Sequence, residues 1–206
     1  AIANEHALSL AGLKPGAALT GGEVMVKNGK LTGLLIDNAV DLVANHIPDP
    51  GSDMIANSLQ QAQSNCFAVG LTTVDDCGLM APTIETIDSL QKAGILKMRV
   101  YAMLSDVASN YEWAFRKGKW KTDRLNVRSF KIYGDGALGS RGACLLAPYT
   151  DRPGYYGFLL SQPAHFDSVA ALLYEKDFQM CTHAIGDSGN RTILRAYAKY
   201  LQGAND

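Results

Sequence analysis

Helix-like and strand-like patterns of apolar residues alternate through most of this chain. Apolar residues spaced three or four apart predict helices over residues 52–68, 82–93, 165–176 and 188–201. Short apolar runs predict strands over residues 71–75, 98–104, 127–133 and 178–183, and a more polar stretch at 111–119 is also expected to be helical. Because strand and helix alternate four times, the pattern predicts parallel strands joined by crossovers, and hence an α/β fold.

The first part of the chain shows a different pattern. Residues 4–10 have helical spacing, and Gly12 is expected to end that helix. The apolar run Val24–Val26 on one side and the pair Lys30–Leu31 on the other flank Asn28 and Gly29. An Asn-Gly pair suits a two-residue turn of type I′, so this stretch predicts a β-hairpin.

A domain boundary is expected shortly after the hairpin. Residues 34–44 return to helical spacing, and the Pro-Asp-Pro-Gly run at 48–51 then interrupts the chain. We therefore expect a peripheral helical and hairpin segment over residues 1–50. The α/β segment is expected over residues 51–206. Ser188 is the expected N-cap of its last helix, and the turn towards the next strand is expected at 203–206.

The composition narrows the class of protein. The 206 residues carry a net charge of -1, with 47% hydrophobic and 19% charged residues, which is typical of globular proteins. No apolar run is long enough to span a membrane, and no basic cluster indicates nucleic acid or a membrane surface as a partner. The four cysteines, none at C-x-x-C spacing, are expected to be reduced in a cytoplasmic protein: Cys66, Cys77, Cys144 and Cys181.

Lys131 is a candidate functional residue because of its position within a predicted strand. Side chains alternate across a strand, so Phe130 and Ile132 are expected to face the helices. Ser129, Lys131 and Tyr133 then face the other way. A buried lysine is costly unless it is paired or neutralised, which leaves two interpretations. One is a salt bridge or a lysine whose ammonium group reaches solvent at the strand end. The other is a lysine of altered pKa that acts as a base, forms a Schiff base or carries a carbamate.

His183 is the second candidate. It ends the strand predicted at 178–183, and ligands bind at the carboxyl ends of parallel strands. Both a structural role and a role as metal ligand are compatible with this position. The other histidines are placed differently: His6 and His46 precede the α/β pattern, and His165 is expected to cap a helix or face solvent.

A glycine motif follows the strand that carries Lys131. Residues 134–139 match G-x-G-x-x-G, but a dinucleotide site also needs a helix directly afterwards. Prolines and glycines instead predict a long loop as far as Gly157, so nucleotide binding is disfavoured. Arg141 in this loop is a candidate to bind a substrate carboxylate, or else a surface arginine. Asp75 and Asp76 are expected to close the first predicted strand, facing a site or acting as turn residues.

Two motifs together resemble a known family. F-K-I-Y-G-D-G-A-L-G-S-R-G-A at 130–143 and T-H-A-I-G-D at 182–187 resemble the amidohydrolase superfamily. A-N-E-H-A-L-S-L-A-G at 3–12 and G-L-T-T-V-D-D at 70–76 extend the resemblance along nearly the whole chain. The branch that these motifs resemble contains metal-dependent hydrolases related to N-substituted formamide deformylase.

The resemblance implies a (β/α)₈ barrel of the TIM type with a small β-sandwich. In such proteins metal ions, usually zinc, activate a water that hydrolyses an amide-like C–N bond of a small molecule. The family pattern has a His-x-His on the first strand, a bridging and often carboxylated lysine on the fourth, histidines after the fifth and sixth, and a catalytic aspartate on the eighth. By this resemblance Lys131 is the bridging metal ligand and His183 is the fifth-strand metal ligand.

The sequence departs from that pattern in one large respect. It contains no His-x-His, and nothing in it matches the sixth-strand histidine or the eighth-strand aspartate. A catalytic zinc site needs three protein ligands and a water, so two ligands do not complete one. We therefore expect a partial barrel, strands two to five of a longer protein. The alternative is an inactive truncated barrel whose open edges pair with another copy as a homo-oligomer.

Overall fold

The computed structural model describes residues 1–201, and these residues form two compact units. We call Asp49–Ile132 together with Leu172–Cys181 the sheet unit. We call Ala1–Pro48, Tyr133–Ala171 and the described residues from Thr182 onward the loop unit. The boundary predicted near residue 50 stays a prediction about domains.

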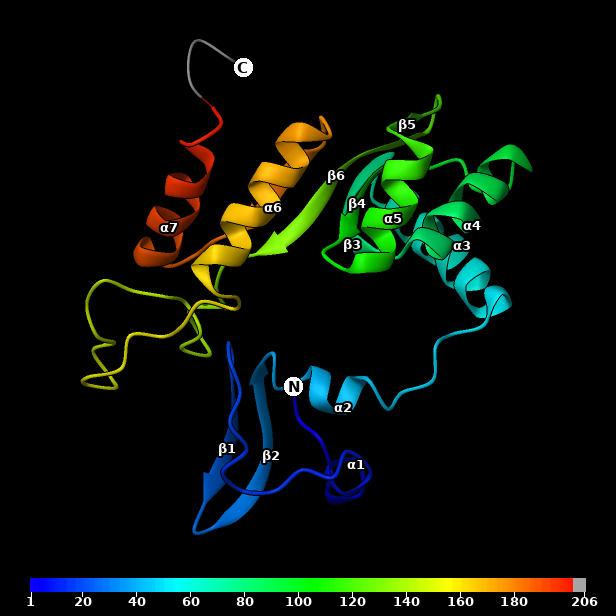
Figure 1. The fold of residues 1–206 in the computed structure, drawn as a ribbon. Helices are drawn as coiled ribbons and strands as arrows, with labels where there is room; N and C mark the ends of the chain where they lie inside the picture. Colours follow the sequence, from blue (N-terminus) through cyan, green and yellow to red (C-terminus); the bar gives the residue numbers. More distant parts are fainter. Residues whose placement is uncertain (202–206) are drawn as a thin grey trace. The chain divides into compact units, whose positions relative to one another are not determined.

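The sheet is built from five strands, four of which match the predicted ones (Figure 1). They are β3 (Thr73–Leu79), β4 (Arg99–Ser105), β5 (Trp120–Lys121), β6 (Leu125–Tyr133) and β7 (Gln179–His183). Their order is β3-β4-β6-β5, and β7 also pairs with β6. The pairs β3–β4 and β4–β6 are parallel, whereas the short β5, which the sequence did not predict, is antiparallel to β6. The predicted α/β fold with parallel strands and flanking helices is confirmed, whereas closure into a barrel stays a prediction.

The helices lie within a few residues of their predicted positions. They are α3 (Ser52–Ala68), α4 (Ala81–Lys92), α5 (Ala108–Lys117), α6 (Pro163–Glu175) and α7 (Asp187–Tyr197). Gly94 ends α4 with a left-handed φ of 72°, as its position in the sequence indicated. Within residues 1–201 no helix is both long and apolar enough to cross a membrane.

The prediction for the start of α7 was wrong. Gly186, not Ser188, is the N-cap, and no side chain caps this helix. The carbonyl oxygen of Cys144 accepts hydrogen bonds from the backbone N–H groups of Ser188 and Gly189, both at 3.1 Å. A distant backbone group therefore replaces the expected side-chain cap. The turn predicted at 203–206 lies outside the described residues.

The prediction for Asp75 and Asp76 also needs correction. Both lie inside β3, which runs on to Leu79, and not at its end. The strand continues because its ladder with β4 persists beyond them, pairing Cys77 with Met103. Neither aspartate is therefore a turn or N-cap residue.

An aromatic cluster forms the centre of the sheet unit. Phe130 on β6 is fully buried and stacks on Tyr111 of α5, with ring centroids 4.4 Å apart. Phe115 of α5 and Phe178 lie against the same ring, at 6.2 and 5.6 Å. Ile132 is buried as well, at 1% exposure. The predicted orientation of Phe130 and Ile132 is thus confirmed, and it places Lys131 on the opposite face of β6.

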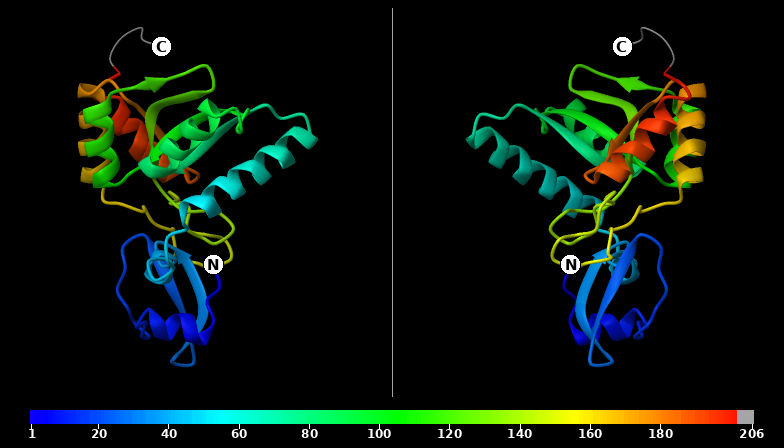
Figure 2. Two further views of the ribbon diagram at one scale, coloured as in Figure 1. Left: turned by 90° about the vertical axis from the view of Figure 1, so that its right-hand side faces the viewer. Right: turned by 90° about the vertical axis from the view of Figure 1, so that its left-hand side faces the viewer.

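The N-terminal part of the loop unit is a hairpin with two short helices (Figure 2). Its elements are α1 (Glu5–Leu10), β1 (Gly22–Lys27), β2 (Lys30–Asp37) and α2 (Asp41–Ala44). Asn28 and Gly29 both have positive φ, 52° and 75°, as a type I′ turn requires, so the predicted hairpin is confirmed.

The helix predicted over residues 34–44 was wrong for its first half. Leu35 belongs to β2, where it pairs with Val24 of β1. It is buried with Leu8 and Ala39 in a small apolar core. Spacing alone cannot distinguish such a strand from a helix, and here pairing with β1 decided the structure.

Candidate functional site

Lys131 lies near the carboxyl end of β6, on the sheet face that points away from α5. Its register partner on β4 is Ser105, and its side chain is half-buried. Tyr101, Gln179 and Cys181 belong to the same polar face of the sheet unit. The Tyr101 hydroxyl donates to Oε1 of Gln179 at 2.7 Å. The positive charge of Lys131 acts on Cys181, so the lysine and the thiol lie near each other.

This polar face changes the acidity of its thiol. Burial raises the pKa of Cys181, while the Ser129 hydroxyl and the Lys131 charge oppose that rise. Burial also raises the pKa of Tyr101. Both groups are therefore neutral near physiological pH.

We expect Cys181 to react slowly with iodoacetamide at neutral pH. The thiolate is the reacting form, and a raised pKa keeps the thiol protonated until the pH is alkaline. Cys77 is exposed and serves as the internal reference. Peptide mass spectrometry over a pH series measures both rates. Equal rates for the two cysteines at neutral pH would contradict this expectation.

His183 ends β7 and belongs to the loop unit. Its side chain is half-buried, and its carbonyl oxygen accepts a hydrogen bond from the N–H of Gly134 at 2.8 Å. Its ring centroid lies 5.7 Å from that of Tyr133. The end of β7 is thus held against the end of β6 and the first residue of the following loop.

Asp37, at the end of the hairpin strand β2, lies near enough to His183 and Asp135 for their charges to act on it. Burial raises the pKa of Asp37; the charge of His183 opposes this shift, and the charge of Asp135 adds to it. A Cβ atom on Gly136 or on Gly142 would overlap the Asp37 carboxylate. Gly136 and Gly142 therefore leave room for the Asp37 side chain of the same unit.

Arg141 is paired within its own loop. Its Nη2 lies 2.7 Å from Oδ2 of Asp151, and its Nε lies 3.1 Å from Oδ1. Both side chains are exposed, and this fork-shaped pairing lowers the pKa of Asp151. The arginine would have to leave Asp151 to bind a substrate carboxylate, so its assignment to substrate stays a prediction.

Asp135 is the site residue that the sequence interpretation missed. It is fully buried, and both carboxylate oxygens accept backbone hydrogen bonds. The sequence shows it only as the variable position between two glycines of the motif. The signal that could have identified Asp135 is its position as an acidic residue between glycines directly after a predicted strand.

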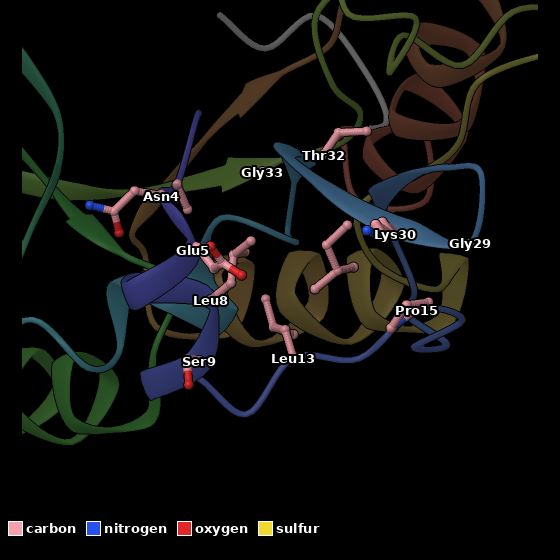
Figure 3. A pocket seen from close by; sticks show the side chains of 12 residues that line it. Asn4, Glu5, Leu8, Ser9, Leu13, Pro15, Gly29, Lys30, Thr32 and Gly33 are labelled. Carbon is pink, nitrogen blue, oxygen red and sulfur yellow. The ribbon is translucent and has the colours of Figure 1, made fainter.

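A hollow of about 730 Å³ lies beside α1 and the hairpin (Figure 3). Leu8, Leu13 and Leu31 form part of its apolar wall. Its polar lining comes from Asn4, Glu5, Ser9, Lys30 and Thr32. None of the residues predicted to bind metal or substrate lines it, and its lining contains neither histidine nor cysteine. The hollow is therefore unsuited to be the predicted metal centre.

A zinc site requires four ligands, or three protein ligands and a water in a catalytic site. The imidazole of His183 is a typical zinc ligand, and a carboxylated Lys131 would offer oxygen donors. Across residues 1–201, however, no group of three or more His, Cys, Asp or Glu side chains is arranged to hold a metal ion. The donor types fit zinc, but the described residues are too few to complete a site.

Comparison with known proteins places the chain in a family. All 206 residues match the amidohydrolase family, and the chain belongs to it. It is 29% identical to protein LONG AFTER FAR-RED 3 of Arabidopsis thaliana, covering 100% of this chain and 38% of that protein. It is 28% identical to the putative amidohydrolase YtcJ of Bacillus subtilis, covering 96% of this chain and 38% of that protein.

Solved structures agree with this placement at the level of the fold. An uncharacterized metal-dependent hydrolase from Pyrococcus horikoshii superposes with a TM-score of 0.72 at 20% identity, over 96% of this chain and 40% of that one. A second, from Pyrococcus furiosus, gives 0.69 at 24% identity, over 96% and 41%. The chain thus spans about two fifths of the length of these relatives. The predicted superfamily is confirmed, whereas the formamide deformylase branch stays a prediction.

Proposed function

We propose that this chain is part of a hydrolase in which a metal-activated water cleaves an amide-like C–N bond of a small molecule. Lys131 and His183 are its metal ligands in this proposal. The observation that carries it is the family match over all 206 residues, including both motifs that contain these side chains. Each candidate also lies near the carboxyl end of its strand, where α/β enzymes bind ligands.

Each ligand has a stated chemical requirement. A bound zinc ion would polarise the substrate carbonyl and lower the pKa of a bound water to about 7. His183 would offer a neutral ring nitrogen. Lys131 would need carboxylation, because an ammonium group has no lone pair to donate. The other donors would come from parts of the longer protein, of whose relatives this chain spans about two fifths.

The same proposal extends to the fold of the longer protein. Strands β3, β4, β6 and β7 would be strands two to five of a (β/α)₈ barrel, in a branch related to N-substituted formamide deformylase. The parallel pairing of β3, β4 and β6 and the likeness to metal-dependent hydrolases support this assignment.

Metal content tests the ligand roles. We expect the longer protein to retain zinc through gel filtration, and His183→Ala and Lys131→Ala each to lower the bound zinc measured by elemental mass spectrometry. His165→Ala is the matched control, because His165 lies in the first turn of α6. Unchanged zinc in the His183→Ala protein would remove His183 from the ligand set. Unchanged zinc in the Lys131→Ala protein would do the same for Lys131.

One observation favours a second candidate. Because the described residues do not complete a donor set, the 206-residue chain by itself suits an inactive partial barrel that folds and pairs with another copy. This candidate predicts a chain that binds no zinc, hydrolyses no amide and elutes as an oligomer. Zinc bound by the 206-residue chain as a monomer would contradict it.

A further inference from the structure

Asp135 is a buried carboxylate to which the proposed metal ligation gives no role. It follows β6 directly and has an exposed fraction of 0%. Burying a carboxylate is costly unless the charge is hydrogen-bonded. The structure provides those bonds entirely from backbone N–H groups, which makes the arrangement dependent on the path of the chain and not on any partner side chain.

Three N–H groups bind the two oxygens. Oδ1 accepts from Ile185 at 2.8 Å, and Oδ2 accepts from Gly186 at 2.8 Å and from Cys144 at 2.9 Å. These donors lie 9, 50 and 51 residues away along the chain. One charge therefore joins the long loop after β6 to the turn between β7 and α7.

Two glycines at the start of α7 are needed for this contact. A Cβ atom on Gly189 would lie 2.5 Å from Oδ2 of Asp135. A Cβ atom on Gly186 would overlap the backbone of Cys144. The turn after β7 can approach the carboxylate only because these two positions carry no side chain.

The same contact also fixes the backbone next to His183, the residue that precedes the turn. Gly134 donates its N–H to the carbonyl oxygen of His183, and Asp135 binds the N–H groups two and three residues after His183. Two consecutive residues after β6 thus hold the backbone that directly follows the His183 side chain. The negative charge also lies beside the first turn of α7, where the helix dipole favours it.

We propose that Asp135 is a positioning residue for His183, which it acts on through the backbone of the turn at 184–186. The part of this inference that concerns zinc rests on the proposed function. The part that concerns the turn rests on the hydrogen bonds alone. Asp135 itself touches neither a substrate nor a metal in this assignment.

The experiment compares Asp135→Asn with Asp187→Asn in the ¹⁵N-labelled 206-residue chain. An asparagine keeps one acceptor oxygen and puts an NH₂ group against a backbone N–H donor, so at least one of the three bonds is lost. Asp187 is the matched control, because its Oδ1 accepts from Leu146 and Ser188 and from no residue of 183–186.

We expect Asp135→Asn to speed hydrogen exchange at Ile185 or Gly186 by about tenfold or more relative to amides of β4, as expected for loss of a charge-assisted bond. The His183 ring resonances should shift in this variant and stay in place in Asp187→Asn. In the longer protein, zinc affinity should fall by about 10- to 100-fold, the range found for residues that orient metal ligands.

Gly189→Ala serves as a second variant if Asp135→Asn fails to fold. It leaves the carboxylate intact but pushes on Oδ2, so it should shift the same amide and ring resonances. The positioning role is overturned if a folded Asp135→Asn or Gly189→Ala chain keeps the exchange rates and the His183 resonances of the wild type. Shifted resonances in a protein whose wild type binds no zinc would support positioning and refute only the metal assignment.

Discussion

Replacing Phe130 by alanine should lower the free energy of unfolding by about 3–5 kcal/mol, the usual cost of removing a buried phenylalanine. Phe130 is fully buried, and its ring contacts Tyr111, Phe115 and Phe178. Alanine would remove three aromatic contacts at once and leave a cavity between β6 and α5. The surrounding rings are held by their own backbones, so they can fill that cavity only in part.

Urea unfolding followed by circular dichroism measures this loss. Phe67→Ala is the matched control, because the same side chain is removed from a position of α3 that is 39% exposed. It should change stability by less than about 1 kcal/mol. Similar losses for the two variants would show that the aromatic cluster is not the centre of the sheet unit.

Replacing Gly186 by alanine should cost about 1–3 kcal/mol or more, the range for forcing extra atoms into a packed region. Gly186 has an ordinary φ of -68°, so alanine introduces no backbone strain there. The cost comes from overlap of the new Cβ with the backbone of Cys144, which cannot move aside as a flexible side chain would. The overlap would also separate the Gly186 N–H from Asp135.

Gly139→Ala is the control for this variant. Gly139 belongs to the glycine motif at 134–139, and a Cβ atom there would meet nothing within 4 Å. We expect it to leave the melting temperature close to that of the wild type, whereas Gly186→Ala should lower it clearly. Equal melting temperatures would mean that the turn after β7 relaxes without cost, which would also weaken the case for Asp135.

Local patterns predicted much of the fold. Asn28 and Gly29 predicted the hairpin, because few residue pairs tolerate two left-handed conformations in succession. The apolar period predicted helices α3, α4, α6 and α7 within a few residues. The stretch containing Leu35 was assigned wrongly, because its spacing fits a helix and only pairing with Val24 reveals a strand.

The candidate site divides in a similar way. Lys131 and His183 could be selected from sequence because alternation along a strand and position at its end are local properties. The salt bridge of Arg141 with Asp151 could not, because two exposed charges ten residues apart in a long loop have no pattern that pairs them.

The sequence by itself determined the alternation of strands and helices, the hairpin turn and the two motifs that mark the family, since each depends on residues within a few positions of one another. Only the tertiary structure decided that Asp135 is a buried carboxylate holding the turn after His183. The reason is that its partners are backbone N–H groups, which every residue except proline carries. A pattern of side chains therefore cannot predict which backbone N–H groups will bind a given carboxylate in the folded chain.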